Sequence, residues 1–225
     1  MELGPGAMIG DMSAAAERLP SAPDPDPWRP PDEDQVVVIH GATWADYQRH
    51  LALRGESAVP RLTYLEGRLE IMSPSRSHEK KASRVGRLVE AYCLHAGIEF
   101  EALGSWTLEK KEAERGAEPD ECYLFGDATL DEDPAVPDLA IEVEWSRRAV
   151  RKLDVYRGLN VPEVWIWHRR DARISVHVLQ SDGYVEVERS EALPEIDLAQ
   201  LASFLDLQSA SAAIRAYRAA LAEAR

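Results

Sequence analysis

The segment that most constrains the fold runs from residue 136 to residue 168, where apolar and charged stretches alternate. An apolar run that carries acids, Pro137 to Glu144, precedes a basic, helix-like stretch from Arg147 to Leu159. A second apolar run follows from Glu163 to Trp167. Two strand-like runs joined by a helix within about thirty residues predict a βαβ unit, because parallel strands need such a crossover. We therefore expect an α/β fold with one mixed central sheet flanked by helices.

Acidic side chains mark the first of these runs. Alternate residues of a strand share a face, so Asp138, Glu142 and Glu144 are expected on one side of the sheet. An unpartnered buried charge costs several kcal/mol or more, so these acids need a divalent metal, a basic partner such as Lys152, or water. A solvated strand end, with the acids paired to nearby arginines, remains open as the alternative.

Composition limits the class of protein. With 225 residues, 45% of them hydrophobic, the chain can bury one good core. The net charge of −14 argues against sequence-independent attraction to nucleic acid. Only Cys93 and Cys122 occur, which excludes a disulfide framework. No signal peptide and no membrane-spanning run is recognisable, so we expect a cytoplasmic protein without membrane contact.

Three parts are expected along the chain. Residues 1–34 are rich in proline and acids and are predicted to be a disordered tail. Residues 35–206 are predicted to form one domain. Residues 207–225 are predicted to form a C-terminal helix, because their apolar residues recur at helical spacing.

Within the domain, Thr43 to Asp46 has the form of a capping box and predicts a helix that runs to about Arg54. Apolar residues at helical spacing predict a long amphipathic helix from His78 to Ala96. A long strand is expected from Ile98 to Glu109, followed by a solvated, charged loop from Lys110 to Glu118. Four cations of the long helix are expected on its solvated face, with a phosphate-facing stripe as the alternative: Lys80, Lys81, Arg84 and Arg87.

Two acids and one lysine could carry chemistry. Asp120 opens one expected strand, Glu142 lies in the next, and Lys152 follows on the crossover helix. Oxygen ligands from adjacent strands suit a hard cation such as Mg²⁺ (or Mn²⁺). A lysine beside a metal-bound water can orient or deprotonate it, or stabilise charge on a phosphate. These groups together predict metal-assisted hydrolysis of a phosphodiester.

The pattern resembles the PD-(D/E)XK nuclease superfamily and, within it, the Uma-two family of proposed restriction endonucleases, formerly a domain of unknown function. The resemblance covers roughly residues 44–205. Its motifs are Tyr64 to Pro74 (YLEGRLEIMSP), His78, Glu118-Pro119-Asp120, Pro137 to Val143 (PDLAIEV), Lys152, Tyr156 and Val161 to Trp165 (VPEVW).

This resemblance implies a restriction-endonuclease-like core with a divalent-metal site. By position, Asp120 would be the motif aspartate and a metal ligand. Glu142 would be the acid of the second motif, and the carbonyl of Val143 a possible further ligand. Glu144 occupies the usual lysine position, which departs from the superfamily pattern, and Lys152 on the following helix would supply the shifted lysine. Glu144 would then be an extra ligand or would repel the substrate.

Three further residues are second-rank candidates. Glu66 lies at the tip of a predicted hairpin, where an ordinary turn residue is an equal alternative. His78 opens the long helix and could contact phosphate or metal, although a cap or surface group is the commoner role. Asp138 could be a ligand or could cap the connecting loop. Tyr156 is expected in the core.

The leading hypothesis is therefore a metal-dependent endonuclease acting on DNA, and a homodimer with one site for each strand is a further expectation. A catalytically silent binding or assembly module of the same fold is the alternative, supported by the missing strand lysine and the −14 charge. A two-carboxylate glycoside hydrolase is a weaker third, because such enzymes need aromatic platforms and aromatic residues make up only 7% of the chain.

Overall fold

The computed structural model describes residue 1 and residues 32–126, 136–145 and 150–223. All the architecture below belongs to the compact unit formed by residues 31–225. The predicted disordered tail falls, apart from residues 1 and 32–34, outside the described residues, and so does the start of the predicted crossover helix at residues 147–149.

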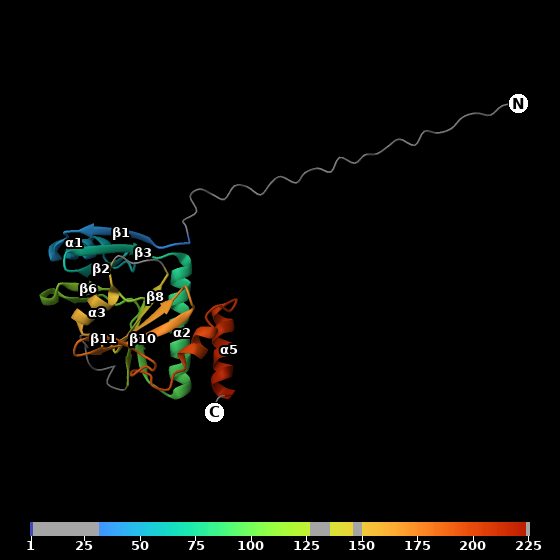
Figure 1. The fold of residues 1–225 in the computed structure, drawn as a ribbon. Coiled ribbons are helices and arrows are strands. Elements are labelled where there is room, and N and C mark those ends of the chain that lie inside the picture. The colour runs from blue at the N-terminus through green and yellow to red at the C-terminus, as the bar shows by residue number, and fades with distance from the viewer. Residues whose placement is uncertain (2–31, 127–135, 146–149, 224–225) are drawn as a thin grey trace. The chain divides into compact units, whose positions relative to one another are not determined.

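The first sheet of the described chain is antiparallel (Figure 1). Its strand order is β1 (Gln35–His40), β3 (Arg68–Ser73), β2 (Arg61–Leu65), β6 (Arg115–Ala117) and β5 (Leu108–Lys110). Helix α1 (Trp44–Arg54) packs against β2, and a 3₁₀ turn (Lys111–Ala113) joins β5 to β6. This sheet was not expected from the sequence.

The second sheet is mixed. Its order is β11 (Gly183–Val187), β10 (Arg173–Gln180), β9 (Glu163–His168), β8 (Leu139–Glu144), β7 (Glu121–Phe125) and β4 (Phe100–Ala102). Strands β8 and β9 are parallel and are joined through α3 (Lys152–Leu159), whereas the other neighbours are antiparallel. The predicted βαβ unit is therefore confirmed, with β8 inside the sheet.

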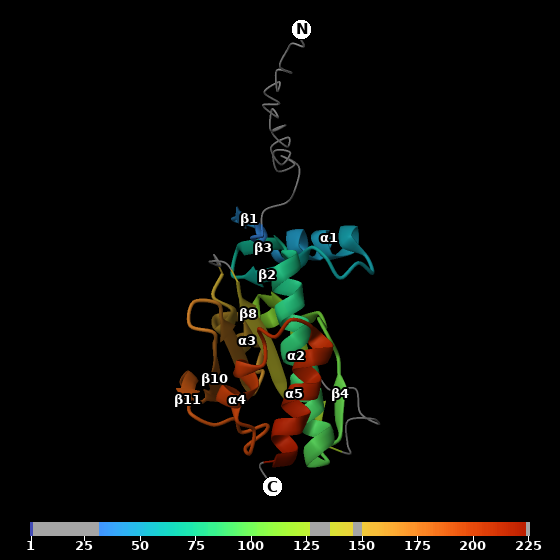
Figure 2. The ribbon, with the colours of Figure 1, turned by 90° about the vertical axis from the view of Figure 1, so that its right-hand side faces the viewer.

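Helices cover both faces of the mixed sheet. Helix α2 (Arg76–Ala96) packs on the face that carries Ile141 and Trp165, together with α4 (Leu198–Ser203) and α5 (Ala210–Glu223). Figure 2 shows α2 and α5 side by side, and the two helices are in contact. Helix α3 covers the opposite face and also contacts β2, β5 and β6, so it lies between the two sheets.

Several local predictions are confirmed. Thr43 and Asp46 form a capping box at the start of α1, since each side chain accepts a hydrogen bond from the other residue's main-chain N–H. The β2–β3 hairpin turns at Glu66 and Gly67, which have φ values of 41° and 84°. In the described residues, no helix is long and apolar enough to cross a membrane.

Three expectations are wrong. The described chain builds two sheets rather than one mixed sheet. The single strand expected over residues 98–109 is two short strands, β4 and β5, which belong to different sheets and are separated by Gly104 with a φ of 59°. The charged loop expected over residues 110–118 is also not solvated throughout. Its second half forms β6 and is buried, because Gly116 packs against the Tyr47 ring and Glu118 is only 2% exposed.

Candidate active site

Asp120 and Glu142 lie across from each other on neighbouring strands. Strands β7 and β8 are antiparallel with Glu121 opposite Ile141, and the Asp120 main-chain N–H donates to the Ile141 carbonyl at 3.1 Å. Continuing this register by one residue places Asp120 opposite Glu142, near the end of β8. Both side chains are buried, at 4% and 2% exposure. The sequence prediction thus named two acids that the fold does bring together.

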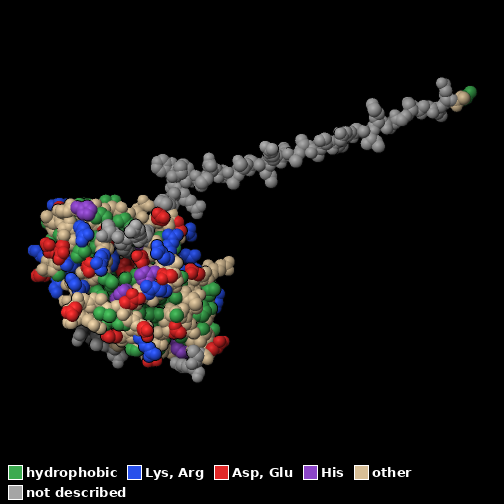
Figure 3. Space-filling view, viewed as in Figure 1, with side chains coloured by type: hydrophobic (Ala, Val, Ile, Leu, Met, Phe, Trp, Pro, Cys, Tyr) green, Lys and Arg blue, Asp and Glu red, His purple; other side chains and the backbone are tan. Residues whose placement is uncertain are grey.

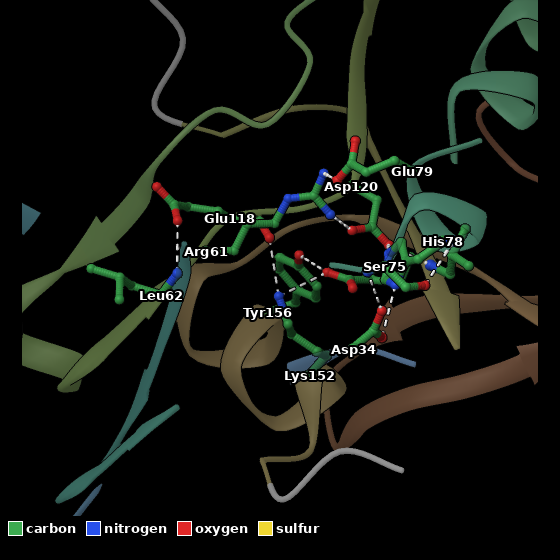
Figure 4. Close-up of polar contacts among 12 residues, drawn as sticks. Asp34, Arg61, Leu62, Ser75, His78, Glu79, Glu118, Asp120, Lys152 and Tyr156 are labelled. Carbon is green, nitrogen blue, oxygen red and sulfur yellow. Dashed lines mark hydrogen bonds and ion pairs between the residues drawn. The ribbon is translucent and has the colours of Figure 1, made fainter. Parts of the chain in front are cut away.

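Two hydrogen bonds and one ion pair from different elements meet at the Asp120 carboxylate (Figure 4). Arg61 of β2 donates to Oδ1, and the Val143 main-chain N–H donates to Oδ2 at 2.6 Å. His78 Nε2, from the first turn of α2, is 3.0 Å from Oδ2. Arg61 also pairs with Glu79 at 2.7 Å. Asp120 is therefore fixed by the first sheet, the mixed sheet and α2 at once.

His78 bridges two carboxylates. Its Nδ1 is 2.9 Å from Asp34 Oδ2, and its ring is fully buried. Burial lowers the pKa of His78, but the charges and hydrogen bonds of Asp120 and Asp34 outweigh burial and raise that pKa to about 9. The imidazole is therefore positively charged at neutral pH. Ser75 caps α2 by accepting the His78 N–H, and this capping bond holds the start of the helix in place.

Helix α3 supplies two partners to Glu142. Lys152 Nζ is 3.1 Å from Glu142 Oε1 and donates to the Glu118 carbonyl at 3.0 Å. Tyr156 donates its hydroxyl to the same Oε1. Residues 152 and 156 are one helical turn apart, so both side chains reach the strand from one face of α3. Tyr156 is in the core as predicted, but its contact with Glu142 was missed.

Glu118 and Arg61 belong to the site and were not singled out from the sequence. The Glu118 carboxylate accepts from Arg54, from Thr107 Oγ1 at 2.8 Å and from the Leu62 main-chain N–H at 2.8 Å. It therefore joins α1, β2 and the segment that carries Asp120. No local pattern marks Arg61, because its partner lies 59 residues away.

The other three candidate carboxylates, those of Glu144, Glu66 and Asp138, have partners of their own. Glu144 is exposed and pairs with His168 Nδ1 at 2.5 Å. Glu66 is exposed at the hairpin and pairs with Arg115, whose hydrogen bond and charge lower the pKa of Glu66. Asp138 accepts the Phe125 main-chain N–H at 2.8 Å and so links the end of β7 to the start of β8. None of the three carboxylates has a contact with Asp120 or Glu142 among the described residues.

The main-chain carbonyl of Val143, the predicted further ligand, accepts the Trp145 N–H at 3.0 Å. The neighbouring N–H of the same residue is bonded to Asp120. Across the described residues, no group of three or more His, Cys, Asp or Glu side chains is placed to hold a metal ion. A cation here would depend on the two carboxylates, on main-chain oxygen and on water.

A cavity of about 320 Å³ opens beside Glu142 and Lys152. Hydrogen bonds run along its wall from His168 Nε2 to Ser175 Oγ at 2.8 Å and on to His177 Nε2 at 2.9 Å. Figure 3 shows histidine side chains lying among acids and cations on one face of the molecule. The cavity thus combines apolar walls with charged and imidazole side chains and is open to a ligand on the α3 side of β8.

Comparison with known proteins agrees with the family suggested by the sequence. The model of the Uma2 family, described as "Putative restriction endonuclease", matches residues 44–212. A solved structure titled a "putative nuclease belonging to DUF820" from Anabaena variabilis is similar, with 16% identity and a TM-score of 0.43. The similarity covers 74% of this chain and 96% of that one. No curated protein matches.

Proposed function

The chain belongs to the Uma2 family, and on that premise we propose that it is a metal-dependent endonuclease that hydrolyses phosphodiester bonds in DNA. The proposal includes a restriction-endonuclease-like core with a site of the PD-(D/E)XK type. Its main support is the pair Asp120 and Glu142, buried opposite each other with Lys152 Nζ 3.1 Å from Glu142.

The donor set fits Mg²⁺ or Mn²⁺. The side chains of Asp120 and Glu142 both offer hard oxygen ligands, and Mg²⁺ commonly binds through one or two carboxylates while keeping several waters. Asp120 and Glu142 would hold the ion, and the main-chain carbonyl of Val143 is the further ligand that the motif position implies. When bound, the ion would supply an activated water and neutralise negative charge on the phosphate.

Lys152 is the residue expected to act on the substrate. Its ammonium has three N–H donors, and the described residues engage two of them, through Glu142 and the Glu118 carbonyl. The remaining donor can reach a phosphate oxygen or the attacking water and stabilise charge there. Arg61 and His78 act through Asp120, because they fix the orientation of its carboxylate.

Nicking of supercoiled plasmid tests the proposal, with Mg²⁺, with Mn²⁺ and with chelator. We expect metal-dependent cutting that is lost in both Asp120→Asn and Lys152→Met. Asp138→Asn is the matched control, because Asp138 lies at the opposite end of β8 and accepts a main-chain N–H without touching Asp120 or Glu142. Cutting at the wild-type rate by Asp120→Asn would contradict the site assignment.

A silent binding or assembly module is the second candidate. Its support is that the described cations already balance both carboxylates, through Arg61 and His78 at Asp120 and Lys152 at Glu142. Calorimetric titration with Mg²⁺ and Mn²⁺ separates the two functions. Binding that Asp120→Asn abolishes supports the nuclease, whereas no binding of either ion supports the silent module.

Cutting both strands with one site each would require two copies of the chain, so the proposal extends to a homodimer on DNA. Sedimentation equilibrium with and without a short duplex measures this. A single copy bound to a duplex that the protein cuts on both strands would contradict the dimer.

A further inference from the structure

A second cavity, of about 370 Å³, lies on the α2 side of the mixed sheet. Its walls come from α2, from the ends of β8 and β9, and from the segment before α5. The charged groups that line it are Lys80, Lys81, Arg84, Arg169 and Asp206. The cavity lining therefore carries four positive side chains and one negative side chain, although the chain as a whole has a net charge of −14.

This cavity and the one beside Lys152 lie on opposite faces of β8 and β9, because neighbouring residues of a strand point to opposite faces. Glu144 and His168 line the cavity beside Lys152, whereas the next residues, Trp145 and Arg169, line the second. Trp145 stacks on Trp167 with ring centres 6.0 Å apart and an interplanar angle of 18°. The strand ends that carry the proposed catalytic carboxylate therefore divide two cavities.

Two of the cations lie over these rings. The Arg169 guanidinium is 4.2 Å from the Trp145 ring centre, and Lys81 Nζ is 4.4 Å from that of Trp167. Lys81 also pairs with Asp206 at 2.5 Å. Lys80 and Arg169 are exposed, so they can meet a ligand without rearrangement.

Arg84 is the residue that points to an anion. Its side chain is buried at 4% exposure, although the sequence suggested a solvated face. Nη1 donates to the carbonyls of Leu205 and Leu207, both at 2.6 Å. Nε and Nη2 have no hydrogen-bond partner among the described residues, nor does any carboxylate there pair with the guanidinium. A buried charge with unused donors is costly unless a ligand completes it.

We infer that this cavity binds a backbone phosphate of the DNA strand near the cleaved bond. The inference rests on the proposed function for the identity of the polymer. Arg84 is six residues along α2 from His78, which contacts Asp120, and a rise of 1.5 Å per residue makes this about 9 Å. The phosphate would therefore lie a short way along the same strand from the scissile one.

The test is binding of a fluorescent duplex, measured by anisotropy in chelator over a range of salt concentrations. Lys80→Ala/Arg169→Ala removes two exposed cations of the cavity. Arg87→Ala/Arg218→Ala is the matched control, because it removes two exposed cations outside the cavity and changes net charge equally. We expect the cavity variant to bind about tenfold more weakly, with a salt slope smaller by about one per lost phosphate contact. Equal losses in both variants would overturn the inference.

Two more variants distinguish a loss of phosphate binding from a loss of folding. Arg84→Met removes the buried guanidinium, and its unfolding midpoint must be measured because the bonds to Leu205 and Leu207 are lost. Asp206→Asn removes the acid that competes with a phosphate for Lys81, so we expect tighter duplex binding. Unchanged or weaker binding by Asp206→Asn would count against the site.

A free phosphate ion could occupy this cavity in place of a DNA phosphate, because both present the same oxygen acceptors. Inorganic phosphate that quenches tryptophan fluorescence, with no competition from duplex, would assign the cavity to a small anion and overturn the DNA assignment.

The nuclease proposal and the phosphate-site proposal are contradicted by different results. Cavity-dependent binding without any plasmid nicking would overturn the nuclease alone. Nicking with wild-type binding in the Lys80→Ala/Arg169→Ala variant would overturn the phosphate site alone. No duplex binding by the wild type would overturn it as well.

Discussion

Replacing Lys152 with Met tests the electrostatic arrangement of the site through stability. Methionine keeps most of the apolar stem of the 6%-exposed lysine but removes the ammonium that contacts Glu142 and the Glu118 carbonyl. The buried Glu142 carboxylate then loses its positive partner. Breaking a buried ion pair from one side costs about 3–5 kcal/mol. For a chain of this size this lowers the thermal midpoint by about 6–20 °C.

A double-mutant cycle isolates the pair. Glu142→Gln alone leaves the Lys152 charge buried, whereas the double variant Lys152→Met/Glu142→Gln removes both charges. We expect the double variant to be less destabilised than the sum of the singles by about 1–3 kcal/mol in urea unfolding with chelator present. Lys80→Met is the control, because an exposed lysine should change stability by less than about 0.5 kcal/mol. Additive costs within about 0.5 kcal/mol would refute the reasoning.

Other predictions concern residues other than the proposed catalytic and metal-binding groups. Gly116→Ala should lower the free energy of unfolding by about 1–3 kcal/mol, because a Cβ there would overlap the Tyr47 ring. An unchanged urea midpoint would contradict that close approach. Burial raises the pKa of Cys93 and Cys122 to about 12, so at pH 8 Ellman's reagent should label the folded protein much more slowly than the unfolded one. Fast native labelling would argue against buried thiols. Burial lowers the pKa of His177 below 6.5, so the folded state binds fewer protons there and stability should fall as pH drops below that value. His177→Gln should flatten this pH dependence, and identical pH slopes would show that His177 does not cause it.

What could be predicted from the sequence is mostly local. The βαβ unit over residues 136–168 follows from run lengths and periodicity, which the neighbouring residues alone determine. The same holds for the capping box of Thr43 and Asp46 and for the turn at Glu66 and Gly67, where the chemistry of two adjacent or nearby residues decides the backbone.

What could not be predicted depends on contacts between distant segments. Strands β5 and β6 have three residues each, which is too short for alternation to appear, so the antiparallel first sheet was missed. Arg61 pairs with Asp120 across 59 positions, and no periodicity reports such a contact. Lys81 and Arg84 have the helical spacing of a solvated face, yet the segment before α5 covers them.

The position of Lys152 in its helix is informative, because a lysine is unfavourable there and needs a compensating contact. It is the first residue of α3, where the helix dipole disfavours a cation by about 0.3–1 kcal/mol. Helix α3 has only eight residues and its N-cap, Arg151, makes no side-chain capping hydrogen bond. Contact with Glu142 offsets the cost. A lysine held by a helix also depends on how that helix packs. Val155, a fully buried residue of α3 that packs in the core, should therefore affect the contact between Lys152 and Glu142.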